Sequence, residues 1–340
     1  MIISRTPFRI SFFGGGTDYP TWYRKNGGAV LATTINKYCY ISARFLPPFF
    51  GYKYRVAWSK IENCKTINAI VHPSVRAAIR FMKIPQGLEI HHDGDLPARS
   101  GLGSSSAFTV GLLHALYALK GHMPNKHKLA EESIYLEQKV LKETVGSQDQ
   151  VLASYGGFNL ITFHKDKQIS VKPVIIPVKR FEELQNHLML FYTGIVRTAS
   201  EVAKTFVPNI AEKEKQLFAM NGMVNQALDI LNSKKDIRDF GKLLHESWNL
   251  KRSLSSSISN SFIDNIYLDA LSTGATGGKI IGAGGGGFLL LFVPPSHQVK
   301  VRKKFSKLIH VPFKFEREGS QIIFFDDQEN YSVKKGRQIK

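Results

Sequence analysis

A glycine- and serine-rich segment, Gly101-Leu102-Gly103-Ser104-Ser105-Ser106, has the residue types of a loop that binds phosphate. Apolar residues follow it mostly at spacings of three, which predicts a helix that begins at the serines. Glycines let the backbone approach a ligand closely, and the free N–H groups at the start of a helix favour an anion. A serine cap on a helix accounts for only one of the three serines. We therefore interpret the segment as a phosphate-binding loop.

Two common phosphate motifs do not describe this loop. A P-loop needs a lysine where this chain has serines, and the dinucleotide fingerprint needs a glycine where Ser106 stands. A later string, Gly282-x-Gly284-x-x-Gly287, does match the fingerprint, but an apolar strand follows it where a helix is required. We interpret this string as a hairpin with a bare backbone that closely approaches a ligand or another loop.

Two aspartates are expected at positions where they could contact a ligand, one in a loop and one at the start of a helix. Asp18 follows Gly14-Gly15-Gly16-Thr17 at the end of the first expected strand, so it either binds a ligand or hydrogen-bonds its own turn. Asp149 follows a glycine break at the start of a short expected helix, where capping is the simplest explanation of the residue taken alone. His245 and Glu246 lack a second histidine four residues away and form no metal motif.

The elements that position these residues follow an α+β order. Strands are expected over residues 2–13, 29–45, 52–58, 88–92, 158–163, 169–178, 188–192, 288–293 and 322–325. Besides the helix after the serines, helices are expected over residues 74–82, 126–144, 199–207, 212–231, 236–254 and 299–308. A domain boundary is expected near residue 185, which gives an N-terminal part, 1–185, and a C-terminal part, 186–340.

Length and composition are those of a globular protein with room for two domains. The chain has 340 residues, of which 43% are hydrophobic and 21% charged. Arg5 and Arg9 interrupt the first apolar run, which argues against a signal peptide, and the apolar run at residues 288–293 is far too short to span a bilayer. Cys39 and Cys64 indicate buried thiols in a reducing compartment. We therefore expect a cytoplasmic protein without membrane insertion.

The formal net charge of +19 favours anionic partners. Lysines and arginines are scattered along the chain, and the small basic cluster near the end comprises Lys334, Lys335, Arg337 and Lys340. No aromatic pattern of an RNA-binding protein accompanies that cluster. Most of the charge is therefore expected on the solvated surface and a minority in a pocket for an anion.

Three glycine-rich segments in this order resemble the three motifs of the GHMP kinases, the family of galactokinase, homoserine kinase, mevalonate kinase and phosphomevalonate kinase. The first is Pro7-Phe8-Arg9-Ile10-Ser11-Phe12-Phe13-Gly14-Gly15-Gly16-Thr17-Asp18-Tyr19, and the others span residues 96–107 and 279–288. The resemblance covers nearly the whole chain. It implies an α+β fold with an N-terminal domain like domain 2 of ribosomal protein S5, a ferredoxin-like C-terminal domain, and an active site between them.

The resemblance further implies ATP and Mg²⁺ as cofactors. The residues whose backbone amides would hold the ATP phosphates are Gly101, Leu102, Gly103, Ser104, Ser105 and Ser106. Ser105 and Glu137 would hold Mg²⁺, and Glu137 precedes Asp149 by twelve residues, as the metal ligand precedes the base in galactokinases. Asp149 would accept or orient the proton of the acceptor hydroxyl, with Arg9 beside it.

The first motif implies a sugar phosphate as the acceptor. Galactokinases carry Gly-Glu-His before Thr-Asp, whereas three glycines here resemble the branch that phosphorylates D-glycero-D-manno-heptose 7-phosphate at its C1 hydroxyl. Its product would feed a nucleotide-activated heptose for a surface polysaccharide. The implied substrate-binding residues are Gly15, Gly16, Asp18, Gly284 and Gly285, with Arg197 and Lys251 as candidates for the 7-phosphate.

Two alternatives to this function stay open. The first keeps the family and takes another sugar, as a fucose-type sugar 1-kinase does. The second is a nucleic-acid-binding protein built on an S5-like domain, which steep salt-dependent RNA binding without ATP turnover would support. Asp18, Glu137 and Asp149 argue against it, because carboxylates repel a phosphate backbone. The expected partners are therefore ATP and a small sugar phosphate, with no nucleic acid.

Overall fold

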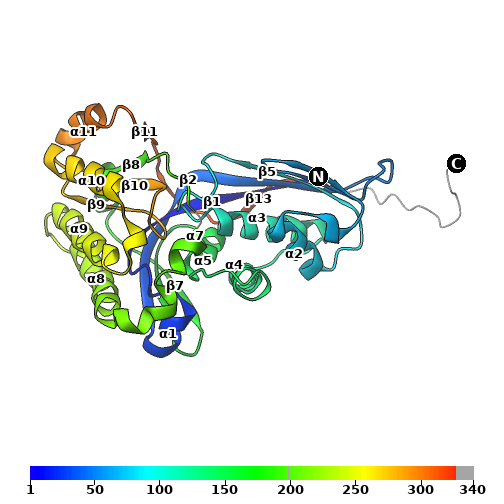
Figure 1. Ribbon diagram of the computed structural model, residues 1–340, viewed down its shortest axis with the longest axis horizontal. Helices are drawn as coiled ribbons and strands as arrows, with labels where there is room; N and C mark the ends of the chain where they lie inside the picture. The colour runs from blue at the N-terminus through cyan, green and yellow to red at the C-terminus, as the bar shows by residue number, and fades with distance from the viewer. Residues whose placement is uncertain (198, 327–340) are drawn as a thin grey trace, which may run out of the picture.

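The computed structural model describes residues 1–197 and 199–326, which form two β-sheets with helices packed against them (Figure 1). The basic cluster near the C-terminus lies outside the described residues. None of the described helices combines the length and the hydropathy needed to cross a membrane.

The first sheet is long and nearly all antiparallel. Its strands are β1 (Ile2–Phe13), β2 (Gly28–Phe45), β3 (Tyr54–Ala57), β4 (Ile61–Cys64), β5 (Leu88–Gly94), β6 (Phe158–Phe163), β7 (Ile169–Pro173), β12 (Phe315–Glu316) and β13 (Gln321–Phe325). The path β13-β1-β2-β5-β3-β4 runs across it, β6 and β12 also pair with β2, and β7 pairs with β6. The pairing of β3 with β5 is parallel. The long strands β1 and β2 are the centre to which the other strands attach.

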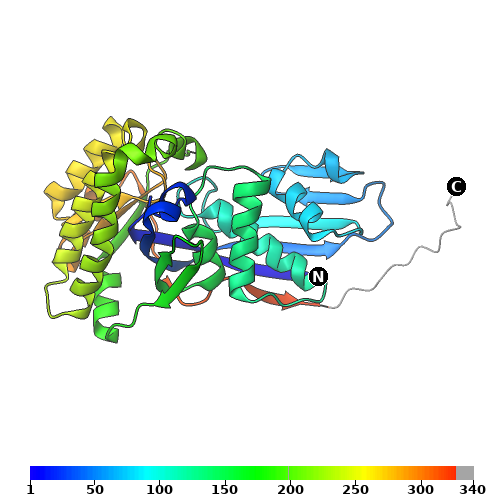
Figure 2. The same cartoon turned by 90° about the horizontal axis from the view of Figure 1, so that it is seen from below.

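Helices cover one face of this sheet, as Figure 2 shows from below. They are α2 (Pro73–Met82), α3 (Ser104–Leu119), α4 (Lys126–Tyr135) and α5 (Gln148–Tyr155). Two further helices contact the sheet through aromatic rings. Tyr23 of α1 (Pro20–Asn26) stacks on Phe163 of β6, and Phe181 of α6 (Val178–Asn186) contacts Phe315 of β12. A Cβ at Gly111 in α3 would lie 2.7 Å from Thr6 Oγ1, and Ser4 Oγ donates to the Gly111 carbonyl at 2.8 Å. Glycine therefore lets α3 lie directly on β1, which fixes the serine loop relative to Arg9 on that strand.

The second sheet has the order β11-β8-β10-β9 and is antiparallel. Its strands are β8 (Leu188–Tyr192), β9 (Gly277–Ile280), β10 (Phe288–Phe292) and β11 (Ile309–His310). The helices around it are α7 (Ala199–Ala203), α8 (Glu214–Asn232), α9 (Arg238–Arg252), α10 (Ser261–Thr273) and α11 (Gln298–Lys304). The glycine string 282–287 connects β9 to β10, so the predicted hairpin is confirmed.

Buried phenylalanines hold the end of β1 against the second half of the chain. The Phe240 ring of α9 lies 5.6 Å from the Phe12 ring and 5.1 Å from the Phe13 ring, both in edge-to-face geometry. Its other neighbour is Phe292 of β10, at 6.0 Å. Such aromatic pairs stabilise beyond the area they bury. The glycines of the first motif, Gly14-Gly15-Gly16, directly follow β1 and are therefore fixed in place by this packing.

Several elements differ from those expected, including two that end early and one helix that was not expected. The helix expected over 126–144 leaves α-geometry after Tyr135 and continues as a π-helix, Leu136–Val140. The strand expected over 169–178 stops at Pro173, and α6 begins at Val178 after Pro177, a residue that cannot continue a β-ladder. No helix was expected over Ser261–Thr273, yet Asn260 caps it by accepting a hydrogen bond from Ile263 N at 3.0 Å.

The last strands return to the first sheet. β13 pairs with β1, and Arg5 Nη2 donates to Gln321 Oε1 at 2.9 Å across 316 residues of chain. Figure 2 shows the red strand β13 beside the N-terminal strand. The division into residues 1–185 and 186–340 stays a prediction, to which the structure adds that residues 315–325 pair with β1 and β2.

Candidate active site

The glycine–serine loop is fastened to β1 by its backbone. Gly101 and Gly103 adopt positive φ angles of 87° and 76°, and Gly103 is the cap from which α3 starts at Ser104. Arg9 N donates to Leu102 O at 3.1 Å, and Arg99 N donates to Ser104 Oγ at 3.1 Å. The predicted helix start at the serines is confirmed, and it offers the free N–H groups that favour an anion.

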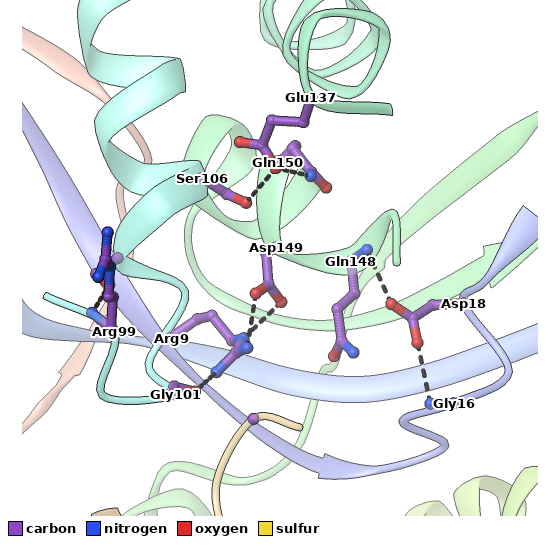
Figure 3. A network of polar contacts seen from close by, with 12 residues as sticks. Arg9, Gly16, Asp18, Arg99, Gly101, Ser106, Glu137, Gln148, Asp149 and Gln150 are labelled. Atoms are coloured by element: carbon purple, nitrogen blue, oxygen red, sulfur yellow. Dashed lines mark hydrogen bonds and ion pairs between the residues drawn. The ribbon is translucent and has the colours of Figure 1, made fainter. Parts of the chain in front are cut away.

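Arg9 and Asp149 form a bidentate ion pair at this loop (Figure 3). Arg9 Nε and Nη2 each lie 2.7 Å from a different carboxylate oxygen of Asp149, and Arg9 Nη1 donates to Gly101 O at 2.6 Å. Arg9 is only 5% exposed. A Cβ at Gly103 would lie 3.2 Å from Arg9 Cγ and 3.4 Å from Asp149 Oδ2, so glycine leaves room for the pair. The structure thus brings the predicted catalytic residues into contact beside the loop.

Asp18 is buried and organises the helix start that carries Asp149. Its carboxylate accepts hydrogen bonds from Gly16 N at 3.0 Å and from Gln148 N at 3.3 Å (Figure 3). Gly146 leaves the space for it, because a Cβ there would lie 1.9 Å from Asp18 Oδ2. Burial raises the pKa of Asp18, and the charge of Asp149 raises it further. Asp18 therefore hydrogen-bonds its own turn, and its binding of a sugar stays a prediction.

A pocket lies beside the ion pair. It is lined by Gly15, Gly16 and Asp18 of the first motif, by Arg9 and Asp149, and by Lys251 and Lys279 from the second half of the chain. No residue of the segment 101–106 is among its lining residues. The ion pair contacts Gly101 and Gly103 and also lines the pocket, so it adjoins both the loop and the pocket.

Two buried lysines face this pocket. Lys251 of α9 donates from Nζ to Ile280 O at 3.3 Å and to Gly282 O, and Lys279 of β9 donates to Phe12 O at 2.8 Å. The pKa of Lys279 is lowered to about 7, mainly by burial and to a smaller extent by the charge of Arg9. Burial, Lys279 and Arg9 together hold the pKa of Lys251 well below its ordinary value. Lys279 was not predicted, although a lysine among Gly277, Gly278 and apolar strand residues was a usable signal.

Glu137 is fully buried under the first turn of α3. Its Oε2 accepts hydrogen bonds from Ser106 Oγ at 2.9 Å and from Gln150 Nε2, as Figure 3 shows. Its Oε1 is buried without a hydrogen-bond partner in the described part of the chain. The pKa of Glu137 is raised to about 8, mainly by burial and to a smaller extent by the charge of Glu143. The π-helix Leu136–Val140 carries this residue, and such segments recur at functional sites.

These oxygens fit a divalent cation, because an unpaired carboxylate oxygen beside a serine hydroxyl is a donor set that Mg²⁺ prefers. Residues 1–197 and 199–326 contain no group of three or more His, Cys, Asp or Glu residues placed to hold a metal ion. The hydroxyl that contacts Glu137 belongs to Ser106, whereas Ser105 is exposed one position earlier. The pairing of Ser105 with Glu137 at a metal stays a prediction.

The third glycine motif packs on the second one, backbone against backbone. A Cβ at Gly282 would lie 2.5 Å from Gly101 O, and a Cβ at Gly287 would lie 2.0 Å from Ser100 O. At these positions the bare hairpin approaches another loop, which is one of the two expectations for it. A Cβ at Gly284 would lie 2.7 Å from Ile258 O, and Gly285 N donates to the same carbonyl at 2.7 Å. Neither glycine is among the residues that line the pocket.

Arg197 is exposed and does not line the pocket. Its backbone N donates to Arg99 O at 3.3 Å, which joins the segment after β8 to the loop before α3. Lys251 is the predicted phosphate candidate that does line the pocket. The substrate roles of Gly15, Gly16, Gly284, Gly285 and Arg197 stay predictions.

The fold and this site define a kinase that transfers a phosphoryl group from ATP to a small molecule. Residues 69–157 match the family model described as GHMP kinases N terminal domain, and residues 224–310 match GHMP kinases C terminal. The chain belongs to the GHMP kinase family, and it is an ATP-dependent sugar kinase with the two-domain fold of that family.

Among characterised relatives, the chain is similar to the D-glycero-alpha-D-manno-heptose 7-phosphate kinase of Campylobacter jejuni. The identity is 29% over 332 residues, which cover 94% of this chain and 97% of that one. A bifunctional fucokinase/GDP-fucose pyrophosphorylase of Arabidopsis thaliana is 24% identical over 86% of this chain and 30% of its own length. The crystal structure of a D-glycero-D-manno-heptose 1-phosphate kinase from Bacteroides thetaiotaomicron has the same fold, with a TM-score of 0.76, 22% identity and coverage of 98% and 100%.

Proposed function

We propose that this kinase phosphorylates the C1 hydroxyl of D-glycero-D-manno-heptose 7-phosphate and gives the 1,7-bisphosphate. The observation that carries the proposal is the Arg9–Asp149 ion pair, which lies between a phosphate-binding loop and a pocket lined by two further cations. The similarity to the Campylobacter jejuni enzyme over nearly the full length of both chains supports the choice of acceptor.

Positioning and charge neutralisation supply most of the rate enhancement in phosphoryl transfer. The free N–H groups of residues 101–106 hold the ATP phosphates at the start of α3. Asp149 accepts the proton of the C1 hydroxyl or orients it, and Arg9 fixes the direction of its carboxylate by two hydrogen bonds. Asp18 keeps α5 in place and offers its carboxylate to sugar hydroxyls.

Mg²⁺ is the second cofactor of the proposal. Glu137 and the serines at the start of α3 would hold it, with Oε1 of Glu137 as the free carboxylate oxygen. When bound there, the ion would neutralise charge on the phosphates of ATP. Burial raises the pKa of Glu137, and a cation beside Oε1 would favour the ionised carboxylate.

The direct test is a substrate panel. The protein is incubated with ATP, Mg²⁺ and heptose 7-phosphate, free heptose, fucose or galactose, and ADP release is followed together with phosphorus NMR of the product. We expect turnover with heptose 7-phosphate and a new resonance of an anomeric phosphate. Turnover with free sugars alone, or a product phosphorylated elsewhere, would overturn the proposal.

A fucose-type sugar 1-kinase is the second candidate. The relatives with fucokinase activity in their names favour it, since one of them aligns with 86% of this chain. In the panel it predicts turnover of fucose and no preference for a phosphorylated sugar. For either acceptor, we propose that the enzyme works in the cytoplasm, and with heptose its product would serve the synthesis of a nucleotide-activated sugar for a surface polysaccharide.

A further inference from the structure

The pocket has an unbalanced charge. Five charged side chains line it, the cations Arg9, Lys251 and Lys279 and the carboxylates Asp18 and Asp149. Arg9 and Asp149 neutralise each other through two hydrogen bonds. Asp18 accepts hydrogen bonds from the backbone N–H groups of Gly16 and Gln148, and no hydrogen bond joins it to either lysine. Three cations against two carboxylates leave at least one lysine without a counter-charge.

Neither lysine has a carboxylate in contact. Their Nζ atoms donate to main-chain carbonyls, Lys251 to Ile280 and Gly282 and Lys279 to Phe12, and the ion pairs of residues 1–197 and 199–326 include neither of them. The two side chains are 8% and 2% exposed, respectively. A buried ammonium without a counter-charge costs several kcal/mol, which is why burial lowers the pKa of both lysines. An anion that enters the pocket with a ligand would favour the charged form of both, so the two lysines together favour an anionic ligand.

The position of the pocket decides which ligand brings the anion. The nucleotide phosphates are expected at residues 101–106, and none of these lines the pocket. The lysines come from α9 and β9 and line the pocket together with Asp149, and the acceptor must lie within reach of Asp149. An ammonium group has three N–H donors, and Lys279 uses one of them on Phe12 O, so donors remain for an anion.

We propose that Lys251 and Lys279 together form the site for the phosphate group of the acceptor sugar, and that Lys279 is a specificity-determining residue. The proposal rests on the proposed function, because it concerns the acceptor of the same reaction. It explains why two lysines are buried beside an ion pair that needs no further cation. It also separates an acceptor that carries a phosphate from a neutral sugar such as fucose.

The competing explanation is that the lysines are only tethers. Lys279 joins β9 to the end of β1, and Lys251 joins α9 to the glycine hairpin, so both bonds would hold the two sheets together without any ligand. Tethers would affect the stability of the protein and both substrates alike. A phosphate site would affect the phosphorylated acceptor alone, and this difference defines the experiment.

The kinetic experiment compares Lys279→Met and Lys251→Met with the wild type and with Lys242→Met. Lys242 is an exposed lysine of the same helix as Lys251, with its side chain 67% exposed and paired with Asp239. Losing a hydrogen bond to a charged group costs ~10- to 100-fold in binding. We expect the KM for heptose 7-phosphate to rise by that factor in the two pocket variants, the KM for ATP to stay within about twofold, and the control to match the wild type.

Lys279→Arg keeps the charge and should recover part of the affinity, which a lost tether alone does not explain. Equal rises in both KM values together with a lower melting temperature would show that the lysines are tethers. A rise confined to the KM for ATP would assign them to the nucleotide. Either result would overturn the proposal.

A binding experiment keeps this test independent of the reaction. Inorganic phosphate is titrated into protein saturated with a non-hydrolysable ATP analogue and Mg²⁺, so that the glycine–serine loop is already filled. We expect phosphate to bind to the wild type and to Lys242→Met. We expect no phosphate binding to Lys279→Met or to Lys251→Met. Phosphate that fails to bind the wild type, or binds all variants equally, would overturn the site. If heptose 7-phosphate is not turned over but this pattern holds, the proposed function fails and the anion site stands.

Discussion

Asp149 is the residue on which the proposed chemistry depends most directly. Both of its carboxylate oxygens are held by Arg9, so Asp149→Asn keeps the size of the side chain but removes the base and the ion pair. Losing a general base costs ~100- to 10,000-fold in rate. We expect a fall in kcat of that order with a circular dichroism spectrum like that of the wild type. Near-full turnover of the variant, measured by ADP release, would contradict the role of Asp149.

Glu137 leads to a second prediction at this scale. In Glu137→Gln the amide oxygen can still accept the hydrogen bonds from Ser106 and Gln150, while the negative charge is lost. We expect the Mg²⁺ concentration at half-maximal activity to rise by ~10-fold at least. The reason is that the charged carboxylate oxygen is replaced by a neutral amide group. The measurement is an Mg²⁺ titration of activity at constant ATP. An unchanged titration would remove Glu137 from the metal site.

The same variant has a signature in stability. The folded pKa of Glu137, about 8, lies above its ordinary value of 4.5, so its contribution to stability is complete below about pH 4.5 and is lost as the pH rises through 8. Without Mg²⁺, urea unfolding of the wild type should therefore lose stability relative to Glu137→Gln between these pH values. A constant difference would show that the carboxyl is not protonated in the folded protein.

At the residue scale, the sequence indicated the type of site better than the role of each side chain. Asp18 and Asp149 were each ambiguous, because an aspartate beside glycines also caps helices and turns. Glu137 lies in the helix expected over residues 126–144, and apolar periodicity predicts neither the π-helix nor the complete burial of this residue. Lys279 was missed because its partner, the carbonyl of Phe12, is 267 residues away in sequence.

The contact between the second and third glycine motifs gives a prediction at the scale of elements. In Gly287→Ala the new Cβ would lie 2.0 Å from Ser100 O, at a φ of 87°. The control is Gly121→Ala, with a φ of 70° and no atom within 4 Å, because it has the same backbone strain without the close contact. We expect Gly287→Ala to lose ~1–3 kcal/mol more of unfolding free energy than the control and to bind ATP more weakly. Equal losses in urea unfolding would show that the contact is not tight.

Most elements could be predicted because their patterns are local. β1 and β2 were found from their β-branched and aromatic residues, and the start of α3 from its glycines and serines. The packing of Gly101 on Gly282 could not be deduced, since no side chain marks it and the residues are far apart in the chain. For the same reason, the sequence left open whether the hairpin meets a ligand or another loop.

The pocket charge belongs to the whole molecule, because Arg9, Asp18 and Asp149 come from one half of the chain and Lys251 and Lys279 from the other. With a pKa of about 7, Lys279 is mostly charged below pH 7. Above pH 7 it is mostly neutral, so it must take up a proton when the phosphate group of the acceptor binds. A sugar phosphate is already dianionic there, since its second pKa is about 6. We expect the KM for the phosphorylated acceptor to rise by up to about tenfold per pH unit above pH 7.

The measurement is a profile of KM against pH for both substrates. Lys279→Arg is the comparison, because an arginine stays charged throughout this range and should give a flatter profile. A rise in the KM for ATP with the same pH dependence would place the titrating group elsewhere.

The pairing of β13 with β1 also bears on how the protein is made. On the ribosome, β1 emerges before the other described strands, and its edge beside β13 has no partner until residues 321–325 have left the exit tunnel. During that interval the nascent chain exposes a strand edge of the kind that associates with other chains. A pause in translation before β13 has emerged should therefore cause more aggregation of the nascent chain than a pause after β13 has emerged.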